Sequence, residues 1–380
     1  MDAERPNLLW TPELALRSKE QVLLEDWKAP NKSAASLKQM EILTSPAPAD
    51  LTTWTTLKPN PAVVLFYQAH LSPPIPSMEE IDEATAKSSL HKDLHLHNVC
   101  RIGDTVIKCS ASPDIIEEAE NLLFLAQKRP KLRIPTVLAA WSTTSITGSA
   151  IYCLMMNFIE GIPLDHEEFA GLPIHAQNII CAKASSQLRY LRELPSEGYY
   201  GRVHKKGWLC PPTGLNSNTS SHRMVVGPYQ TYEEYCAAVY RSSQVQKAAS
   251  YSCVDWPSKH AELMARLISV FPGWGPQEPK LTWMDPKTAN IIARQVEGDN
   301  GGEDWEVFLI DWECLGWYPA WLQGLQVDSC CNIMLRDPEQ PSEFHPYRSS
   351  EIKGRVMKDF DPEPDWERIA MVHSLHWVFY

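Results

Sequence analysis

The sequence lacks the short motifs that mark several common classes of enzyme. It contains no Walker A motif, no dinucleotide-binding glycine fingerprint, no zinc-binding signature and no G-x-S-x-G nucleophile elbow. These absences argue against the enzyme classes that each motif defines. Residue order alone still leaves a Ser-His-Asp triad open.

Pairs of cysteines at C-x-x-C spacing are also absent, although the chain has ten cysteines. We expect free thiols packed as small apolar side chains, as in a reducing compartment. The N-terminus has no basic segment followed by an apolar run, and no stretch is long and apolar enough to cross a membrane. The sequence therefore predicts a soluble cytoplasmic protein.

Positive charge is in short supply. Lys and Arg number 35 against 47 Asp and Glu, which gives a net charge of -12. Nucleic acids and anionic membranes both require a basic surface, so neither is an expected partner. The charge favours a cationic small-molecule substrate. The 380 residues suffice for one large core or two lobes, and nothing in the sequence defines an oligomeric state.

The most informative motif is a pair of polar residues followed by a short apolar strand. Asp285 and Asn290 have the D-x-x-x-x-N spacing of a kinase catalytic loop, in which Asp orients the attacking hydroxyl and Asn holds Mg²⁺. The apolar run 307–310 predicts a strand that delivers Asp311 to the same metal. Oxygen ligands from two neighbouring loops suit Mg²⁺, which is a hard cation.

Two segments carry a resemblance to a known family. Thr282–Ile292 and Leu309–Pro319 resemble the signature of the aminoglycoside-phosphotransferase-like kinases of filamentous fungi. The second segment matches very closely. In the first segment the family has His, Gly, Leu and Arg where this chain has Trp283, Met284, Pro286 and Ala289.

An upstream region supplies the nucleotide-binding half of such a kinase in the expected order. Val99–Gly103 and Thr105–Cys109 read as two strands around a tight turn. Ile115–Gln127 has the apolar spacing of a helix. The resemblance implies that Lys108, in Val-Ile-Lys, contacts the α- and β-phosphates, and that Glu118 is its ion-pair partner.

The resemblance continues through Arg133–Val137 and Tyr152–Gly161, the second of which is similar to the strand and hinge of the family. It implies that Met156 and Phe158 lie at the nucleotide. Taken as a whole it implies an α+β, two-lobed, protein-kinase-like fold, with a small β-rich lobe and a larger, mainly helical lobe.

Three departures from the kinase pattern bear on activity. The segment Ser89–Val99 contains no glycine, whereas kinases place a glycine-rich loop there so that backbone N–H groups approach the phosphates. Trp283 replaces a histidine that braces the catalytic loop, and an indole also offers an N–H donor. Lys287 stands where protein kinases have a lysine that reaches the γ-phosphate; the simpler interpretation is a solvated surface charge.

Two further clusters have simpler interpretations. His91, His95 and His97 suggest a metal site, but no cysteine or acid completes it, so solvated loop histidines are the simpler interpretation. An aromatic group near the second motif suggests a cation-binding box, for which core packing is the simpler alternative. The group consists of Trp312, Trp317, Tyr318 and Trp321.

These anchors divide the chain into three parts. We expect an extension rich in Pro, Ser and Thr that is partly packed on the lobes, a small lobe and a large lobe, at residues 1–89, 90–157 and 158–380. Within the large lobe we expect a central helix, an insertion, a helix after the second motif, a polar excursion and a closing helix, at 174–194, 201–226, 321–334, 336–365 and 366–379.

The leading hypothesis is an ATP- and Mg²⁺-dependent phosphotransferase that acts on a hydroxyl of a small molecule. Asp285 and Lys287 are the catalytic candidates, and Asn290 and Asp311 the metal ligands. The alternative is a pseudokinase that binds a ligand or partner without turnover, favoured by the glycine-free segment and Trp283. A third possibility is another nucleotide-dependent chemistry, such as adenylylation.

Overall fold

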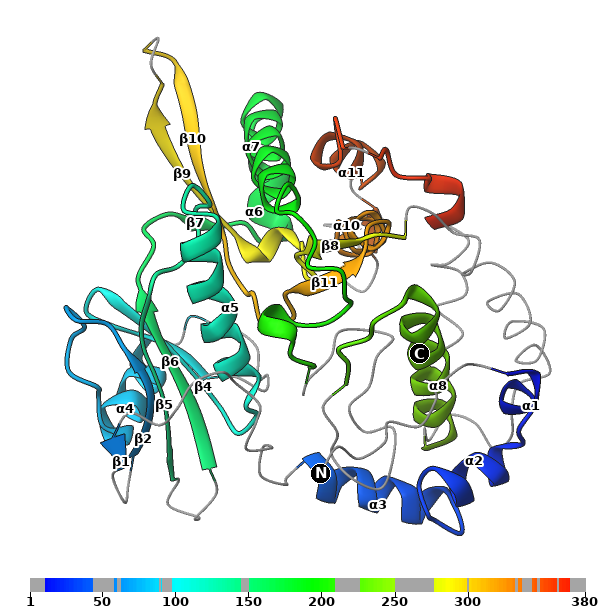
Figure 1. Cartoon of the computed structure of the whole chain (residues 1–380). Helices are drawn as coiled ribbons and strands as arrows, with labels where there is room; N and C mark the ends of the chain where they lie inside the picture. The colour runs from blue at the N-terminus through cyan, green and yellow to red at the C-terminus, as the bar shows by residue number, and fades with distance from the viewer. Residues whose placement is uncertain are drawn as a thin grey trace.

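The computed structural model describes residues 11–43, 58–59, 63–88, 90, 98–144, 150–208, 226–249, 277–298, 301–331, 334–336, 344–346, 349–360 and 362–369. They form a small lobe built on an antiparallel sheet and a larger lobe of helices with short strands (Figure 1). This is the α+β, two-lobed, kinase-like fold that the sequence predicts. No helix of the described residues is long and apolar enough to span a membrane.

The small lobe is a six-stranded sheet in the order β1-β2-β5-β6-β4-β3. Helices α4 and α5 lie against it and contact β3 and β4–β6 respectively (Figure 1). The bounds of these elements are β1 Lys58–Pro59, β2 Val63–Gln68, α4 Met78–Ser88, β3 Asn98–Ile102, β4 Thr105–Ser110, α5 Asp114–Lys128, β5 Val137–Thr144 and β6 Ala150–Asn157.

The hairpin of β3 and β4 determines which side chains lie on each face of the sheet. Its turn contains Gly103 at a φ of 60°, a conformation that glycine adopts without steric cost. Residues then alternate between faces. Ile107 and Cys109 join the apolar cluster that includes Ile81 of α4, while Val106 packs with the cluster that includes α5. The predicted strands and helix of this region are confirmed.

The large lobe is organised around α7, which contacts β8, β10 and α11. The predicted central helix is therefore confirmed, with its end at Arg192. The elements of this lobe are β7 Ile162–Pro163, α6 His166–Gly171, α7 Ile174–Arg192, η1 Val203–Lys205, α8 Tyr232–Ala249, β8 Pro279–Thr282, η3 Thr288–Asn290, β9 Ile291–Glu297, β10 Glu303–Leu309, β11 Gly316–Pro319, α10 Leu322–Cys330, β12 Met334–Arg336, β13 Phe344–Pro346 and α11 Ser349–Val356.

One apolar core runs through both lobes. It joins Leu125 and Leu154 of the small lobe to Leu188 and Leu309 of the large lobe. The backbone N–H of Leu309 also donates to the carbonyl of Arg133 at 2.9 Å. The end of β10, and with it the residues that follow, is thus held against the small lobe.

The N-terminal region divides between two places. Helices α2 (Lys19–Glu25) and α3 (Lys32–Leu43) lie against α8, and the indole N–H of Trp27 donates to the Val245 carbonyl at 2.9 Å. Strand β2 instead pairs with β5, and α4 contacts β3, so the small lobe includes residues 63–88. Part of the segment 1–89 thus packs on the small lobe as a strand of its sheet, a pairing between distant segments that leaves no local sequence signal.

Two predictions for the C-terminal part need correction. The helix expected over 321–334 ends at Cys330, and Met334 begins a strand that pairs with β13. The region expected as a polar excursion contains α11, whose Ile352 and Val356 are buried in the main core. Most of the expected closing helix and residues 209–225 of the expected insertion lie outside the described residues.

Candidate functional site

A buried ion pair connects the sheet of the small lobe to α5. The Nζ atom of Lys108 on β4 lies 2.8 Å from Oε2 of Glu118 on α5, and both side chains are almost fully buried. The predicted ion pair is therefore present. Burial by itself lowers the pKa of Lys108, but the carboxylates of Asp311, Glu118 and Glu313 outweigh it and raise that pKa well above its ordinary value. Lys108 stays charged.

The loop between β8 and β9 brings three of the candidate residues together. The Nδ2 amide of Asn290, at the end of η3, donates to Oδ2 of Asp285 at 2.9 Å and to the Asp285 carbonyl at 3.0 Å. Lys287 contributes an ion pair, with Nζ 2.6 Å from the same Oδ2. The loop thus fixes the direction of the Asp285 carboxylate, and Lys287 is a partner of Asp285 rather than a freely solvated charge.

Asp311 connects this loop to the ion pair. It lies just after β10, beyond Ile310, and has a φ of 65°, which is uncommon for a residue with a side chain and recurs at functional sites. Its Oδ1 lies 2.9 Å from Nζ of Lys108, and its Oδ2 accepts from Nδ2 of Asn290 at 3.3 Å. Polar candidates that are up to 203 residues apart in sequence therefore form one connected group.

Trp283 supports this polar group through a hydrogen bond to the backbone of Asp311, as the sequence analysis expects of a buried indole. It is 1% exposed, its indole N–H donates to the Asp311 carbonyl at 3.1 Å, and its ring stacks on Trp312 at a centroid distance of 5.4 Å. The side-chain amide of Gln323 on α10 accepts a hydrogen bond from the backbone N–H of Trp283 and donates one to the Trp283 carbonyl. The indole thereby supports the unusual backbone at Asp311.

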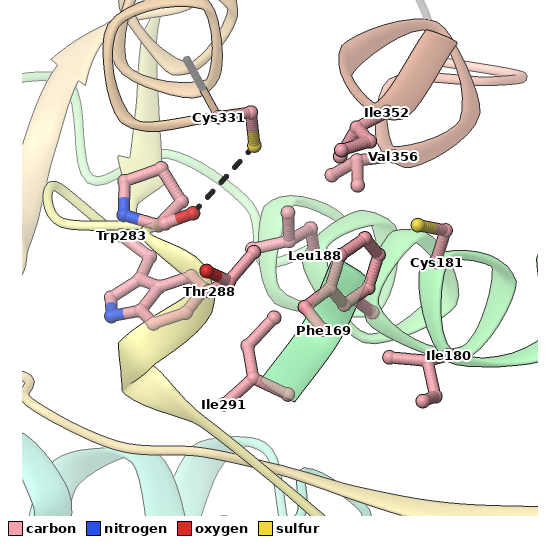
Figure 2. Close-up of a pocket in the computed structure, with 12 residues that line it drawn as sticks. Phe169, Ile180, Cys181, Leu188, Trp283, Thr288, Ile291, Cys331, Ile352 and Val356 are labelled. Carbon is pink, nitrogen blue, oxygen red and sulfur yellow. Dashed lines mark hydrogen bonds between the residues drawn. The ribbon is translucent and has the colours of Figure 1, made fainter. Parts of the chain in front are cut away.

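A small apolar cavity lies beside Trp283 (Figure 2). Its walls come from α6, α7, α11 and the loop, and include Phe169, Leu188 and Val356. The thiol of Cys331 donates to the Pro286 carbonyl across one side at 3.9 Å. With almost no polar lining, this cavity supports the loop and offers little to a polar substrate.

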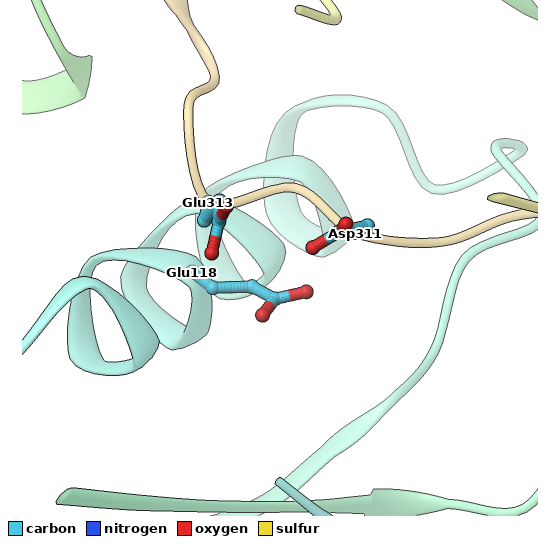
Figure 3. Close-up of side chains that lie close together, drawn as sticks. All are labelled: Glu118, Asp311 and Glu313. Atoms are coloured by element: carbon cyan, nitrogen blue, oxygen red, sulfur yellow. The ribbon is translucent and has the colours of Figure 1, made fainter. Parts of the chain in front are cut away.

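Glu313 is a member of the site that the sequence analysis does not select. Figure 3 shows it with Asp311, on the segment after β10, facing Glu118 of α5. One carboxylate oxygen from each lies within 4.8 Å of the others, and Glu313 is 3.6 Å from Nζ of Lys108. Burial raises the pKa of Glu313 to about 8. The spacing Asp-Trp-Glu is the sequence signal that could have identified it.

The donor set of this region fits a hard divalent cation. Carboxylate oxygens are the ligands that Mg²⁺ prefers, and three of them converge here. The amide of Asn290 lies beside Asp311 as well. The group carries more negative than positive charge around Lys108, which a cation would offset.

The last two candidates, Met156 and Phe158, lie at the end of β6. Met156 is 7% exposed and packs in the main core, opposite Val106 of β4. Phe158 donates its backbone N–H to the Asp104 carbonyl at 2.8 Å, and the guanidinium of Arg101 covers its ring. The structure places both near the β3–β4 hairpin.

The remaining features singled out in the sequence are the aromatic group, the three histidines and the glycine-free segment. The aromatic group after Asp311 is buried, with Trp312, Trp317 and Tyr318 at 0% exposure, so core packing is confirmed over a cation-binding box. The three histidines and most of the glycine-free segment lie outside the described residues.

The two-lobed fold and the connected polar group agree with the arrangement that the family resemblance implies. Comparisons with models of protein families and with curated proteins gave no match. Solved structures that this chain resembles include aminoglycoside phosphotransferases.

Among them are the GDP and kanamycin complex of APH(2")-IIIa, with 15% identity, coverage of 77% of this chain and 82% of that chain, and a TM-score of 0.46. The streptomycin–ATP–APH(2")-IIa complex has 13% identity, 80% and 90% coverage and a TM-score of 0.47. A thermostable APH(4)-Ia mutant with AMP-PNP and hygromycin B has 11% identity, 80% and 88% coverage and a TM-score of 0.47. At this level, the similarity establishes neither activity nor substrate for this chain.

Proposed function

We propose that the protein is an ATP- and Mg²⁺-dependent phosphotransferase that acts on a hydroxyl group of a small molecule. One observation carries the proposal. The ammonium of Lys108 lies within 2.9 Å of both Glu118 and Asp311, while the amide of Asn290 joins Asp311 to Asp285. Five polar side chains from separate parts of the chain are thus connected, which supports a site for phosphoryl transfer.

Asp285 is the residue that orients the attacking hydroxyl in this proposal. Its Oδ2 is held by Lys287 and Asn290, while Oδ1 lies 3.7 Å from the thiol of Cys330. Oδ1 is therefore the oxygen that would accept the hydrogen bond of the acceptor hydroxyl. In this proposal Lys287 holds Asp285 and would lie beside the transferred group.

The nucleotide would lie against the small lobe. Lys108 would clamp its phosphates and Glu118 would keep Lys108 in position, with Met156 and Phe158 beside the base. Asn290 and Asp311 would hold Mg²⁺, which would offset the negative charge of the phosphates. Such a site works by positioning and by charge neutralisation, so Lys108, Asn290 and Asp311 would act electrostatically.

The acceptor that best fits the charge is cationic. The carboxylates of Asp285 and Asp311 belong to the assembled group, and the whole chain has a net charge of -12. Acceptor tests would therefore compare aminoglycosides with neutral polyols of similar size. A preference for the neutral acceptors would overturn this part of the proposal.

A melting curve combined with a phosphate-transfer assay tests the main proposal. We expect millimolar Mg·ATP to raise the melting temperature, because a ligand of the folded state adds RT ln(1 + [L]/Kd) to stability. Asp285→Ala should keep this shift and lose transfer to acceptors. A wild-type protein indifferent to Mg·ATP, Mn·ATP and GTP would overturn the proposal.

The same assay separates the alternatives. A protein that binds Mg·ATP and transfers nothing to any acceptor would be a pseudokinase. Transfer of AMP, detected as released pyrophosphate, would indicate adenylylation. Trp283 no longer argues for inactivity, because its indole N–H bonds the Asp311 carbonyl and supports the site.

A further inference from the structure

Two thiols of the small lobe face each other across adjacent strands. Cys109 of β4 and Cys153 of β6 are register partners, and their Sγ atoms lie 2.8 Å apart. Both residues are buried among the apolar side chains of the face that includes Ile81 of α4. Lys108 precedes Cys109 and points to the opposite face of the sheet, since neighbouring residues alternate along a strand.

The backbone at this pair has the spacing that a disulfide needs. The N–H of Phe158 donates to the carbonyl of Asp104, so these two opposed residues form a hydrogen-bonded pair. Hydrogen-bonded and non-hydrogen-bonded pairs alternate in an antiparallel ladder, and the register of β4 with β6 is unbroken. Cys109 and Cys153 are therefore a non-hydrogen-bonded pair, whose Cα atoms lie about 4.5 Å apart. Disulfides span Cα distances of about 4.4–6.8 Å.

We propose that Cys109 and Cys153 form an intramolecular disulfide under oxidising conditions, which makes the small-lobe sheet a site of redox modification. The oxidant is a small-molecule disulfide. Each cysteine gives up its hydrogen, the Cys109–Cys153 bond forms, the S–S bond of the oxidant breaks, and two small thiols leave. The inference is independent of the proposed phosphotransfer.

The bond would form during folding or local opening rather than in the closed sheet. The contact with Cys153 and burial raise the pKa of the Cys109 thiol, and the thiolate is the form that attacks a disulfide. Once formed, the bond would tie β4, which carries Lys108, to β6. It would also close the loop that contains α5 and β5, which restricts the unfolded chain and stabilises the lobe.

Production of the full chain in an oxidising and in a reducing host cytoplasm tests the proposal, because the thiols then meet oxidant before burial. After alkylation of free thiols, we expect the protein from the oxidising host to contain a peptide that links Cys109 to Cys153. Its melting temperature should fall on addition of a reductant. Cys153→Ser should abolish the linked peptide and the effect of the reductant, whereas Cys181→Ser, a buried cysteine on α7, should change neither.

Two results would overturn the proposal. One is a soluble protein from the oxidising host in which both cysteines are alkylated. The other is a bond from Cys109 to Cys100, the third cysteine of the same cluster. The peptide map of the wild-type protein decides between these outcomes even if Cys153→Ser does not fold, and Cys153→Ala then serves as the second variant.

Discussion

Replacement of Trp283 by histidine examines whether the tryptophan supports the site or inactivates it. The indole is 1% exposed, donates to the Asp311 carbonyl at 3.1 Å and stacks on Trp312. An imidazole is also a donor but fills much less space. The substitution should therefore enlarge the cavity beside the loop and loosen the backbone at Asp311.

The loss of stability in Trp283→His follows from the packing that the indole provides. A loss of about 75 Å³ of side-chain volume, at about 24 cal/mol per Å³ of residual cavity, costs roughly 2 kcal/mol. The lost stacking on Trp312 adds about 0.5–1.5 kcal/mol. We expect a decrease in the free energy of unfolding of about 2–4 kcal/mol in total. Phosphoryl transfer should not increase, because the hydrogen bond from the indole to the Asp311 carbonyl is lost with the ring.

Urea unfolding measures the loss of stability, and the Mg·ATP-induced melting shift measures the site. Trp141→His is the matched control, because Trp141 is equally buried in the small lobe but packs in the cluster that faces α4. Trp141→His should lower the free energy of unfolding without the same loss of the Mg·ATP-induced melting shift. A Trp283→His protein as stable as the wild type, with increased phosphoryl transfer, would show that the tryptophan is an inactivating substitution.

Three further predictions follow from the charged group. Asp311→Asn should remove the Mg²⁺-dependent part of the ATP-induced melting shift. The melting temperature of the free protein should stay nearly unchanged, since the substitution relieves repulsion between carboxylates. An intact shift would exclude Asp311 as a metal ligand. Glu118→Gln should weaken nucleotide binding by releasing Lys108, measured by titration calorimetry; unchanged affinity would remove the assigned role. Because burial raises the pKa of Glu313 from 4.5 to about 8, ionisation of this carboxyl opposes folding, so stability should fall as the pH rises through that window. Glu313→Gln should flatten this decrease in urea-unfolding experiments, and an identical pH profile would contradict the assignment.

Local sequence patterns were sufficient to predict an element where a single segment contains all the residues that define it. The hairpin around Gly103 and the helix bearing Glu118 follow from residue spacing and turn chemistry, and the structure contains both. The same holds for the strand before Asp311, which ends at Leu309. The motif spacing also selected the residues that form the connected polar group, although their roles remain proposals.

Local patterns failed where burial against a distant segment decided the outcome. Helix α11 forms in a polar, proline-bearing stretch because Ile352 and Val356 reach the main core. Glu313 becomes a site residue because the segment after β10 turns it towards Lys108. Both outcomes depend on contacts with segments that are distant in the sequence.

The amino-acid sequence by itself determined the candidates Asp285, Asn290 and Asp311, because their spacing is defined within short segments. It also carried the family resemblance that implied Lys108, Glu118 and the order of the elements. Only the tertiary structure decided that β2 completes the small-lobe sheet, that Glu313 faces the ion pair and that Cys109 lies opposite Cys153. These are pairings between distant segments. Their register is set by the packing of whole elements, which no single stretch of sequence specifies.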